Sequence, residues 1–214
     1  MKNRNFISFK NELVDAIRSG RKWQTRRLLK PQPTDYGAGW FGLKTTPTSV
    51  VKWNVLDGPA PIAQYMPFQP GNRPYVRESY WKHPSGDIAI GNRPDVSWRY
   101  VNSMFMPKAL SRCTIEITDV RVQQVRDISE EDARAEGMSP NWADDYLTGW
   151  NPEEHGFLPL NWEKLHGEDD EGVFYTARDA FLATWDYLNP ANPVESNPWV
   201  VAYTFEDVTN ANEA

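Results

Sequence analysis

The chain contains little cysteine, little histidine and no long apolar segment. Its 214 residues include one cysteine, Cys113, which excludes an internal disulfide framework and a cysteine-based zinc site. The three histidines, at positions 83, 155 and 166, lack the spacing of zinc ligands. No apolar run approaches the roughly 18 residues of a membrane-spanning helix, and no signal-type segment follows the first residues. We therefore expect a cytoplasmic protein with no membrane partner, no metal and no cofactor.

Positive charge is also scarce. The chain has 23 Lys and Arg against 29 Asp and Glu, a formal net charge of −6. Proteins that coat nucleic acid neutralise phosphates with many basic residues, so a global DNA-coating surface is excluded, whereas a local basic cleft is not. The hydrophobic content of 40%, with 10 Trp, 9 Tyr and 9 Phe, is typical of a globular chain. We expect a single domain over residues 1–214.

The first predicted helix spans 9–19. Ser8 is placed to cap its start, and Gly20 is placed to end it. Its apolar residues recur every four positions, as expected for a face that packs on a core: Phe9, Leu13 and Ile17.

Two further helices are predicted towards the C-terminus. Ser129 precedes three acidic residues and is typical of an N-cap, so a helix of two turns at most should run to Gly137. Thr176 is placed to cap a third helix, which should end before Asn189 because a proline follows.

The clearest strand covers 113–122, and its apolar residues switch from odd to even positions part-way along. Ile115 and Ile117 hold odd positions, whereas Val120 and Val122 hold even ones. A bulge between the two pairs would keep both pointing inward, as in a sheet that curls towards a barrel.

Two other segments, 75–81 and 199–205, also have strand composition. On the first, Val76, Glu78 and Tyr80 would share a face. Burying a carboxylate beside an apolar residue and an aromatic one costs free energy unless the carboxylate is paired. Glu78 is therefore a candidate functional residue.

Two long segments show no sustained period. Eight prolines lie between positions 31 and 74, so we expect an irregular segment there. Its expected anchors are Trp40, Phe41 and Trp53. Residues 138–174 combine Pro, Gly and many acidic residues, and we interpret them as an acidic insertion.

Residues 20–27 are the most informative stretch, because they place a lysine, a threonine and three arginines after a helix-ending glycine. Lys22 and Thr25 are three positions apart. That spacing separates them on a flat strand but brings them together on one turn of helix or in a tight loop, where a base could meet a hydroxyl. The alternative is a helix end followed by a solvated basic loop.

An ordered series of motifs resembles the ASCH domain of the PUA-like superfamily, in the form found in bacteriophages and prophages. The series consists of the N-terminal helix, Gly20-x-Lys22-x-x-Thr25-x-Arg27, the segment from Pro70 to Glu78, the strand entry from Met106 to Arg112, the segment Ser129 to Ala133, and Asn197 to Val200. The similarity covers 6–137 and 175–206. It implies an α+β fold, a small curled PUA-like β-barrel with flanking helices and a large irregular insertion. The expected location is the cytoplasm of a bacterium or of a phage-infected host.

The resemblance also implies a catalytic set. The typical family motif has an acid where this chain has Thr25, and the threonine form, with a glutamate on a later strand, resembles the bacterial amidohydrolase that deacetylates 4-N-acetylcytidine. Carried over, Thr25 is the nucleophile, Lys22 the base and Glu78 the acid or orienting group. This assignment agrees with general chemistry, because a desolvated lysine has a lowered pKa and can take the proton of a hydroxyl group.

In related domains the cleft receives RNA, nucleosides or modified bases, so a modified nucleoside or RNA is the expected partner. The candidate binding residues are Trp23, Arg26, Arg27 and Arg77. For Arg27 and Arg77, phosphate binding and support of the barrel both stay open. Trp81 and Trp98 lie close in sequence to polar candidates and are further candidates for lining a pocket.

Three functions follow from these observations. The first is hydrolysis of an acylated cytosine nucleoside, which Thr25 favours. The second is a non-catalytic ASCH module that binds RNA or a modified nucleotide, such as a phage factor acting against host defence. A ribonuclease or a protein-interaction role is the third and least favoured. The small amidohydrolase lacks the insertion at 138–174, so this segment is expected to reshape the cleft.

Overall fold

The structure, a computed structural model, describes residues 5–57, 61–138 and 176–209. The described helices are α1 (Asn11–Arg18), α2 (Glu130–Ala135) and α6 (Ala177–Leu188). The described strands are β1 (Phe6–Ser8), β2 (Gln24–Leu28), β3 (Thr34–Gly37), β4 (Trp40–Lys44), β5 (Val50–Asn54), β6 (Tyr75–Arg77), β7 (Tyr80–Lys82), β8 (Ile88–Ile90), β9 (Arg99–Val101), β10 (Ile115–Gln124) and β11 (Trp199–Asp207). This mixture of helices and sheets confirms the predicted α+β class.

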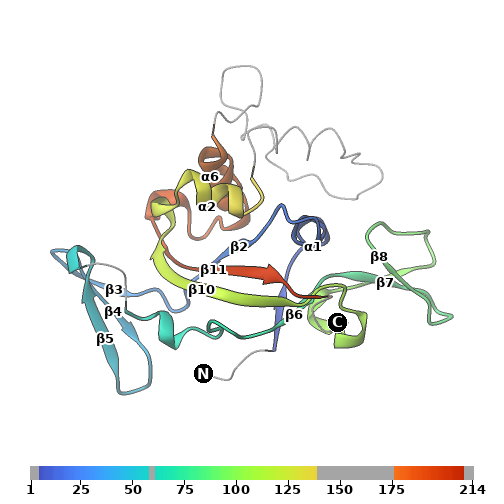
Figure 1. The fold of residues 1–214 in the computed structure, drawn as a ribbon, viewed down its shortest axis with the longest axis horizontal. Coiled ribbons are helices and arrows are strands. Elements are labelled where there is room, and N and C mark those ends of the chain that lie inside the picture. Colours follow the sequence, from blue (N-terminus) through green and yellow to red (C-terminus); the bar gives the residue numbers. More distant parts are fainter. Residues whose placement is uncertain (1–4, 58–60, 139–175, 210–214) are drawn as a thin grey trace.

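The central sheet is antiparallel, with the strand order β10-β11-β2 (Figure 1). Beside it, β1 and β6 form a parallel pair, and a single bridge from Tyr75 to Thr114 connects β6 to the start of β10. Among the described strands no pairing joins β1 to β2, so the sheet is open and does not close into a barrel. The curled barrel of the prediction is therefore not confirmed.

The predicted bulge in the long strand is confirmed. The pairing of β10 with β11 shifts register between Ile117 and Asp119. The shift lets Ile117, Val120 and Val122 all enter the core, although they differ in parity. The last strand alternates as expected, since Tyr203 and its neighbours two positions away are buried in the same core.

The first helix is shorter than predicted. It begins after Lys10, which makes no side-chain capping bond, because the backbone of Ser8 pairs with β6. Phe9 is buried but lies before the helix. Val14 is the fully buried helical residue, whereas Leu13 is only partly buried. Ile17 is buried in the core as predicted, and Val14 joins it there as a core residue that the prediction left out.

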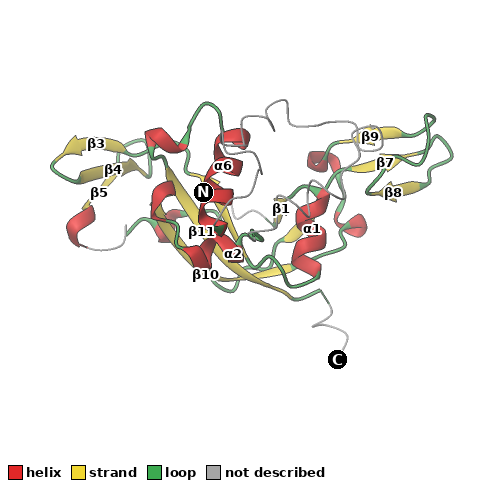
Figure 2. Ribbon diagram, turned by 90° about the horizontal axis from the view of Figure 1, so that it is seen from above, coloured by secondary structure: helices red, strands yellow, loops and turns green. Residues whose placement is uncertain are grey.

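The two later helices begin where the sequence predicts. The Ser129 side chain accepts a bond from the backbone N–H of Asp132, and Thr176 does the same for Asp179. The two helices pack together over a second apolar cluster, to which α6 contributes Phe181. Figure 1 shows them next to each other above the central sheet, and Figure 2 views the molecule from that side.

The prediction of an irregular segment over 31–74 is wrong for 34–54. This part forms an antiparallel sheet in the order β3-β4-β5. The prolines flank the strands, and the β3 to β4 turn uses Gly37 and Gly39, whose φ angles of +80° and +77° suit glycine. Of the expected anchors, Trp53 is buried and Phe41 packs against it, whereas Trp40 is exposed.

Two other expectations concern segments further along the chain. The predicted strand 75–81 is interrupted, because β6 and β7 are separate strands on either side of Glu78 and Ser79. Of the acidic insertion, residues 139–174 lie outside the described residues.

Candidate functional site

Lys22 lies in the short connection between α1 and β2. Gly20 turns the chain there with a φ of +72°, a left-handed conformation that glycine adopts without a Cβ clash. The Lys22 side chain is 3% exposed. Its Nζ donates to the backbone oxygen of Glu136 and to Oε2 of the same residue, both at 2.7 Å. The lysine is therefore buried and ion-paired.

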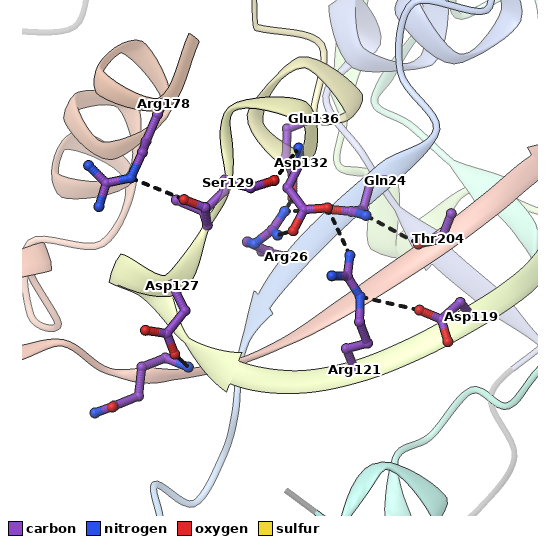
Figure 3. A network of polar contacts seen from close by, with 12 residues as sticks. Gln24, Arg26, Asp119, Arg121, Asp127, Ser129, Asp132, Glu136, Arg178 and Thr204 are labelled. Carbon is purple, nitrogen blue, oxygen red and sulfur yellow. Dashed lines mark hydrogen bonds and ion pairs between the residues drawn. The ribbon is translucent and has the colours of Figure 1, made fainter. Parts of the chain in front are cut away.

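Glu136 joins Lys22 to a second buried cation. It follows α2, and its Oε1 accepts a bond from Nη1 of Arg26 at 3.2 Å. Arg26 also donates from Nη2 to Asp132 at 2.6 Å, and Asp132 in turn binds Arg121 at 2.8 Å, so that it lies between two guanidinium groups (Figure 3). We call Lys22, Arg26, Asp132 and Glu136 the polar cluster. It fixes the end of α2 to the start of β2.

Burial and charge act in opposite directions on Lys22. Desolvation lowers the pKa of its ammonium group most strongly, and the adjacent Glu136 carboxylate raises it. The nearby Arg27 and Arg26 lower it further, and the net direction is downward. This lysine therefore releases its proton more readily than an exposed one, and the Glu136 carboxylate is in direct contact with it.

Thr25 lies within β2 and not on a turn with Lys22. It pairs with Tyr203 of β11, so the two side chains share one face of the sheet. Arg26 is the next residue along the strand and therefore faces the other side. The expected shared turn is thus wrong, because the chain is already pairing as a strand at Thr25. Its side chain is buried.

Glu78 is fully buried between β6 and β7 and belongs to a different polar group. Arg112 binds it with two parallel bonds, from Nε to Oε1 at 2.8 Å and from Nη2 to Oε2 at 2.5 Å. Arg112 also contacts Asp15 of α1 at 3.0 Å. The predicted pairing of this carboxylate is confirmed.

The hydrogen bonds of the described residues do not join Lys22, Thr25 and Glu78 to one another. They bring Lys22 together with Arg26, which was a predicted binding residue, and with Glu136 and Asp132, which the sequence argument missed. An acidic residue three positions after a helix N-cap, as at Asp132, or at the C-terminal end of a short helix, as at Glu136, is too common a feature to have identified either one.

Of the other candidate binding residues, Trp23 has a side chain that is 46% exposed. Arg27 contacts the N-terminal segment of the same chain. Nη2 of Arg27 donates to the Ser8 backbone oxygen at 2.6 Å, and its guanidinium lies 4.8 Å from the ring centroid of Phe9. These contacts hold β2 against β1. Of the two roles left open for Arg27, they support the structural one.

Arg77 is also held by neighbouring side chains and backbone. Its Nε and Nη2 donate to the Tyr75 hydroxyl at 3.0 and 2.7 Å, and its Nη1 donates to the Met104 oxygen at 2.8 Å. The guanidinium stacks 3.7 Å from the ring centroid of Phe6. These contacts also favour support of the fold over phosphate binding.

Cys113 is buried, and desolvation raises the pKa of its thiol to about 12, so it is not a nucleophile at neutral pH. Among residues 5–57, 61–138 and 176–209, no cluster of three His, Cys, Asp or Glu side chains is arranged to hold a metal ion. The same residues include no helix that is long and apolar enough to span a bilayer.

Comparisons with protein-family models, with curated proteins and with solved structures found no match to this chain.

The pair of Glu78 and Arg112 gives an asymmetric stability prediction. Arg112→Ala should lower the free energy of unfolding by about 3 to 5 kcal/mol, because it leaves a fully buried carboxylate without its partner. Glu78→Gln should cost less, since Arg112 is 28% exposed and keeps Asp15. Urea unfolding measures both. Arg73→Ala is the matched control, because its pair with Glu116 lies at the surface and should contribute about 1 kcal/mol or less. Equal losses for Arg112→Ala and Arg73→Ala would contradict the prediction.

Proposed function

We propose that this protein is an ASCH-type amidohydrolase that removes the acyl group from a modified cytosine nucleoside such as 4-N-acetylcytidine. The proposal rests on one observation above the others. A lysine that is 3% exposed, with a pKa lowered by burial, lies three residues from a threonine whose side chain is also buried. The open curved sheet of β10, β11 and β2, with β1 and β6 beside it, is compatible with a PUA-like barrel, which we include in the proposal.

The reaction would proceed through an acyl-enzyme. The Thr25 oxygen attacks the acyl carbon while its proton passes to neutral Lys22. The bond to the exocyclic amine then breaks, and the Lys22 ammonium returns the proton to the leaving amine. Water hydrolyses the threonyl ester, which releases the carboxylic acid and restores the hydroxyl. For this sequence Lys22 must start without its extra proton, a form that burial favours because desolvation lowers the pKa of its ammonium group.

A side-chain movement is part of the proposal. Thr25 faces the Tyr203 side of β2, whereas the Lys22 ammonium contacts Glu136 together with Arg26, which faces the other side. Lys22 therefore has to exchange a bond to Glu136 for one to Thr25 when substrate binds. A four-carbon side chain allows such an exchange.

Glu78 acts in this proposal as a positioning residue. Both of its oxygens are occupied by Arg112, which is also bound to α1 through Asp15. A carboxylate with this coordination orients an element of the fold and does not transfer a proton. Of the two roles implied for Glu78, the orienting one is therefore retained.

The test is release of cytidine from 4-N-acetylcytidine, followed by chromatography. We expect turnover by the wild-type protein and a loss of about a hundredfold or more in Thr25→Ala, because the attacking oxygen is gone. Thermal unfolding of both proteins checks that the variant is folded. Equal rates in the two proteins, or no release by a folded wild type, would overturn the assignment.

One observation favours a second function, a non-catalytic module that binds RNA or a modified nucleotide. Lys22 and Glu78 each form an ion pair, Lys22 with Glu136 and Glu78 with Arg112. The pair with Glu136 stabilises the ammonium form of the lysine. Titration calorimetry with 4-N-acetylcytidine separates the two functions. Binding without any release of cytidine assigns the module, and release of cytidine assigns the enzyme.

A further inference from the structure

The small sheet β3-β4-β5 lies at one end of the molecule, opposite the sheet that contains β7 and β8 (Figures 1 and 2). Its strand β5 pairs with β4 on one side, and no described strand pairs with its other side. At the two ends of the β4–β5 ladder, the N–H of Thr45 donates to Ser49 and the N–H of Val55 donates to Gly39, both at 3.0 Å. Hydrogen-bonded pairs alternate along an antiparallel ladder, so the backbone groups of residues 49, 51, 53 and 55 are directed at β4.

The backbone groups of Val50, Lys52 and Asn54 are therefore directed at the free edge of β5. Within the described part of the chain, these N–H and C=O groups have no hydrogen-bond partner. Such a row is a template for pairing with another strand. The opposite edge of the sheet is protected, because β3 follows two prolines and carries a register shift between Asp35 and Gly37. Strand β5 has neither feature.

The side chain of Lys52 does not shield the free edge. A lysine on an edge strand commonly keeps other strands away. Here its Nζ lies 4.5 Å from the ring centroid of Tyr36, which belongs to β3 on the far side of β4. Gly42 of β4 makes this crossing possible, since a Cβ there would lie 2.7 Å from the Tyr36 ring and 3.3 Å from Cγ of Lys52. The lysine side chain thus extends over the sheet and away from the edge.

The two faces of β5 differ in chemistry. Val51 and Trp53 face the core, and Val51 is only partly buried there. Lys52 lies on the outer face beside Lys44 of β4, and the outer face of these two described strands carries no acidic side chain. This face is therefore positive in a chain whose net charge is −6. A strand that suits the edge has acidic side chains on the outer face and apolar ones on the inner face.

We propose that the free edge of β5 binds an extended acidic segment of a partner protein, which pairs antiparallel to β5 as a fourth strand of the sheet. The backbone groups at positions 50, 52 and 54 provide the affinity, and the alternation of acidic and apolar side chains provides the specificity. A second copy of this chain suits the edge less well, because like charges on neighbouring strands repel. Neither Lys22 nor Thr25 takes part, so the inference is independent of the hydrolase proposal.

The test is a titration of isotope-labelled protein with a blocked peptide of about eight residues in which glutamate and valine alternate. The backbone amide resonances of Val50, Lys52 and Asn54 should shift, and these amides should become protected from hydrogen exchange because they gain partners. The amides of Val51 and Trp53 already pair with β4, so they should be protected before the peptide is added.

Two changes separate the contributions of charge and backbone. Lys52→Glu should weaken binding by about threefold to tenfold and should favour a peptide with lysine in place of glutamate. Lys82→Glu is the matched control, because Lys82 is exposed on the sheet at the opposite end, and it should leave the affinity unchanged. A peptide N-methylated at its glutamates should not bind, because in antiparallel pairing these residues carry the N–H groups directed at β5.

Three results would overturn the proposal. The first is the absence of shifts at Val50, Lys52 and Asn54 with about 1 mM peptide, the weak limit of specific binding. The second is equal affinity for the N-methylated peptide, which would show that the backbone edge is not used. The third is a shift of the same amides with protein concentration alone, which would assign the edge to a second copy of this chain. The amide spectrum of each variant also shows whether it is folded.

Discussion

Glu136→Ala is expected to lower the free energy of unfolding by about 3 to 5 kcal/mol. The change removes the carboxylate that lies between Lys22 and Arg26, at 2.7 and 3.2 Å respectively. Both cations are buried, so water cannot replace the hydrogen bonds that they make to the carboxylate. Lys22 keeps only the backbone oxygen of position 136, and Arg26 keeps Asp132.

The reciprocal change should be milder. Lys22→Ala leaves Glu136 paired with Arg26, so the buried carboxylate keeps a cationic partner. The loss of free energy of unfolding should therefore be smaller than for Glu136→Ala. Glu131→Ala is the control, because Glu131 is exposed on the same helix, and it should change stability by less than about 0.5 kcal/mol. Guanidinium unfolding curves at neutral pH measure all three variants. The reverse order of Lys22→Ala and Glu136→Ala would show that the polar cluster does not depend on Glu136.

Local signals account for the parts of the fold that the sequence predicted well. The parity change between Ile117 and Val120 identified the bulge because a sheet with one buried face penalises any other register. Ser129 and Thr176 identified two helix starts because a capping hydroxyl satisfies a backbone N–H within its own turn. In each case the deciding contact lies within a few residues or follows from one strand.

The predictions that proved wrong concern segments in which strand pairing with a distant part of the chain outweighed a weak local pattern. Prolines on either side suggested an irregular segment, yet 34–54 pairs as three strands around a turn at Gly37 and Gly39. The first helix starts late because Ser8 joins a parallel strand pair, for which a three-residue segment carries no periodic signal. Both outcomes depend on tertiary pairing that the local sequence does not encode.

The polar partners of the candidate site were also beyond local reasoning. Lys22 and Glu136 are separated by 114 positions, and Glu78 and Arg112 by 34. The apolar neighbours of Glu78 in the sequence indicate that it needs a cation, but they do not indicate which of the 23 basic residues supplies it. For Lys22 even the need for a carboxylate was missed, because a lysine after a helix is ordinarily solvated.

The pH dependence of deacetylation gives the sharpest test of Lys22 as the base. The rate should rise with pH as the ammonium deprotonates, and burial should bring the midpoint below the ordinary lysine pKa of about 10.4. The neighbouring Glu136 carboxylate raises that pKa, so Glu136→Gln, which keeps a hydrogen-bond acceptor without the charge, should move the midpoint to lower pH. The measurement is the rate of cytidine release from about pH 6 to about pH 11, a range that spans the titration of a buried and of an ordinary lysine.

Two conservative variants complete this experiment. Lys22→Arg should be inactive throughout the range, because a guanidinium stays protonated, and Thr25→Ser should keep partial activity because it keeps the hydroxyl. A Glu136 that serves only the fold would lower stability in Glu136→Gln but leave the midpoint unmoved. That result, or activity in Lys22→Arg, would remove Lys22 from the catalytic role, because the proton would then have to leave Thr25 by another route.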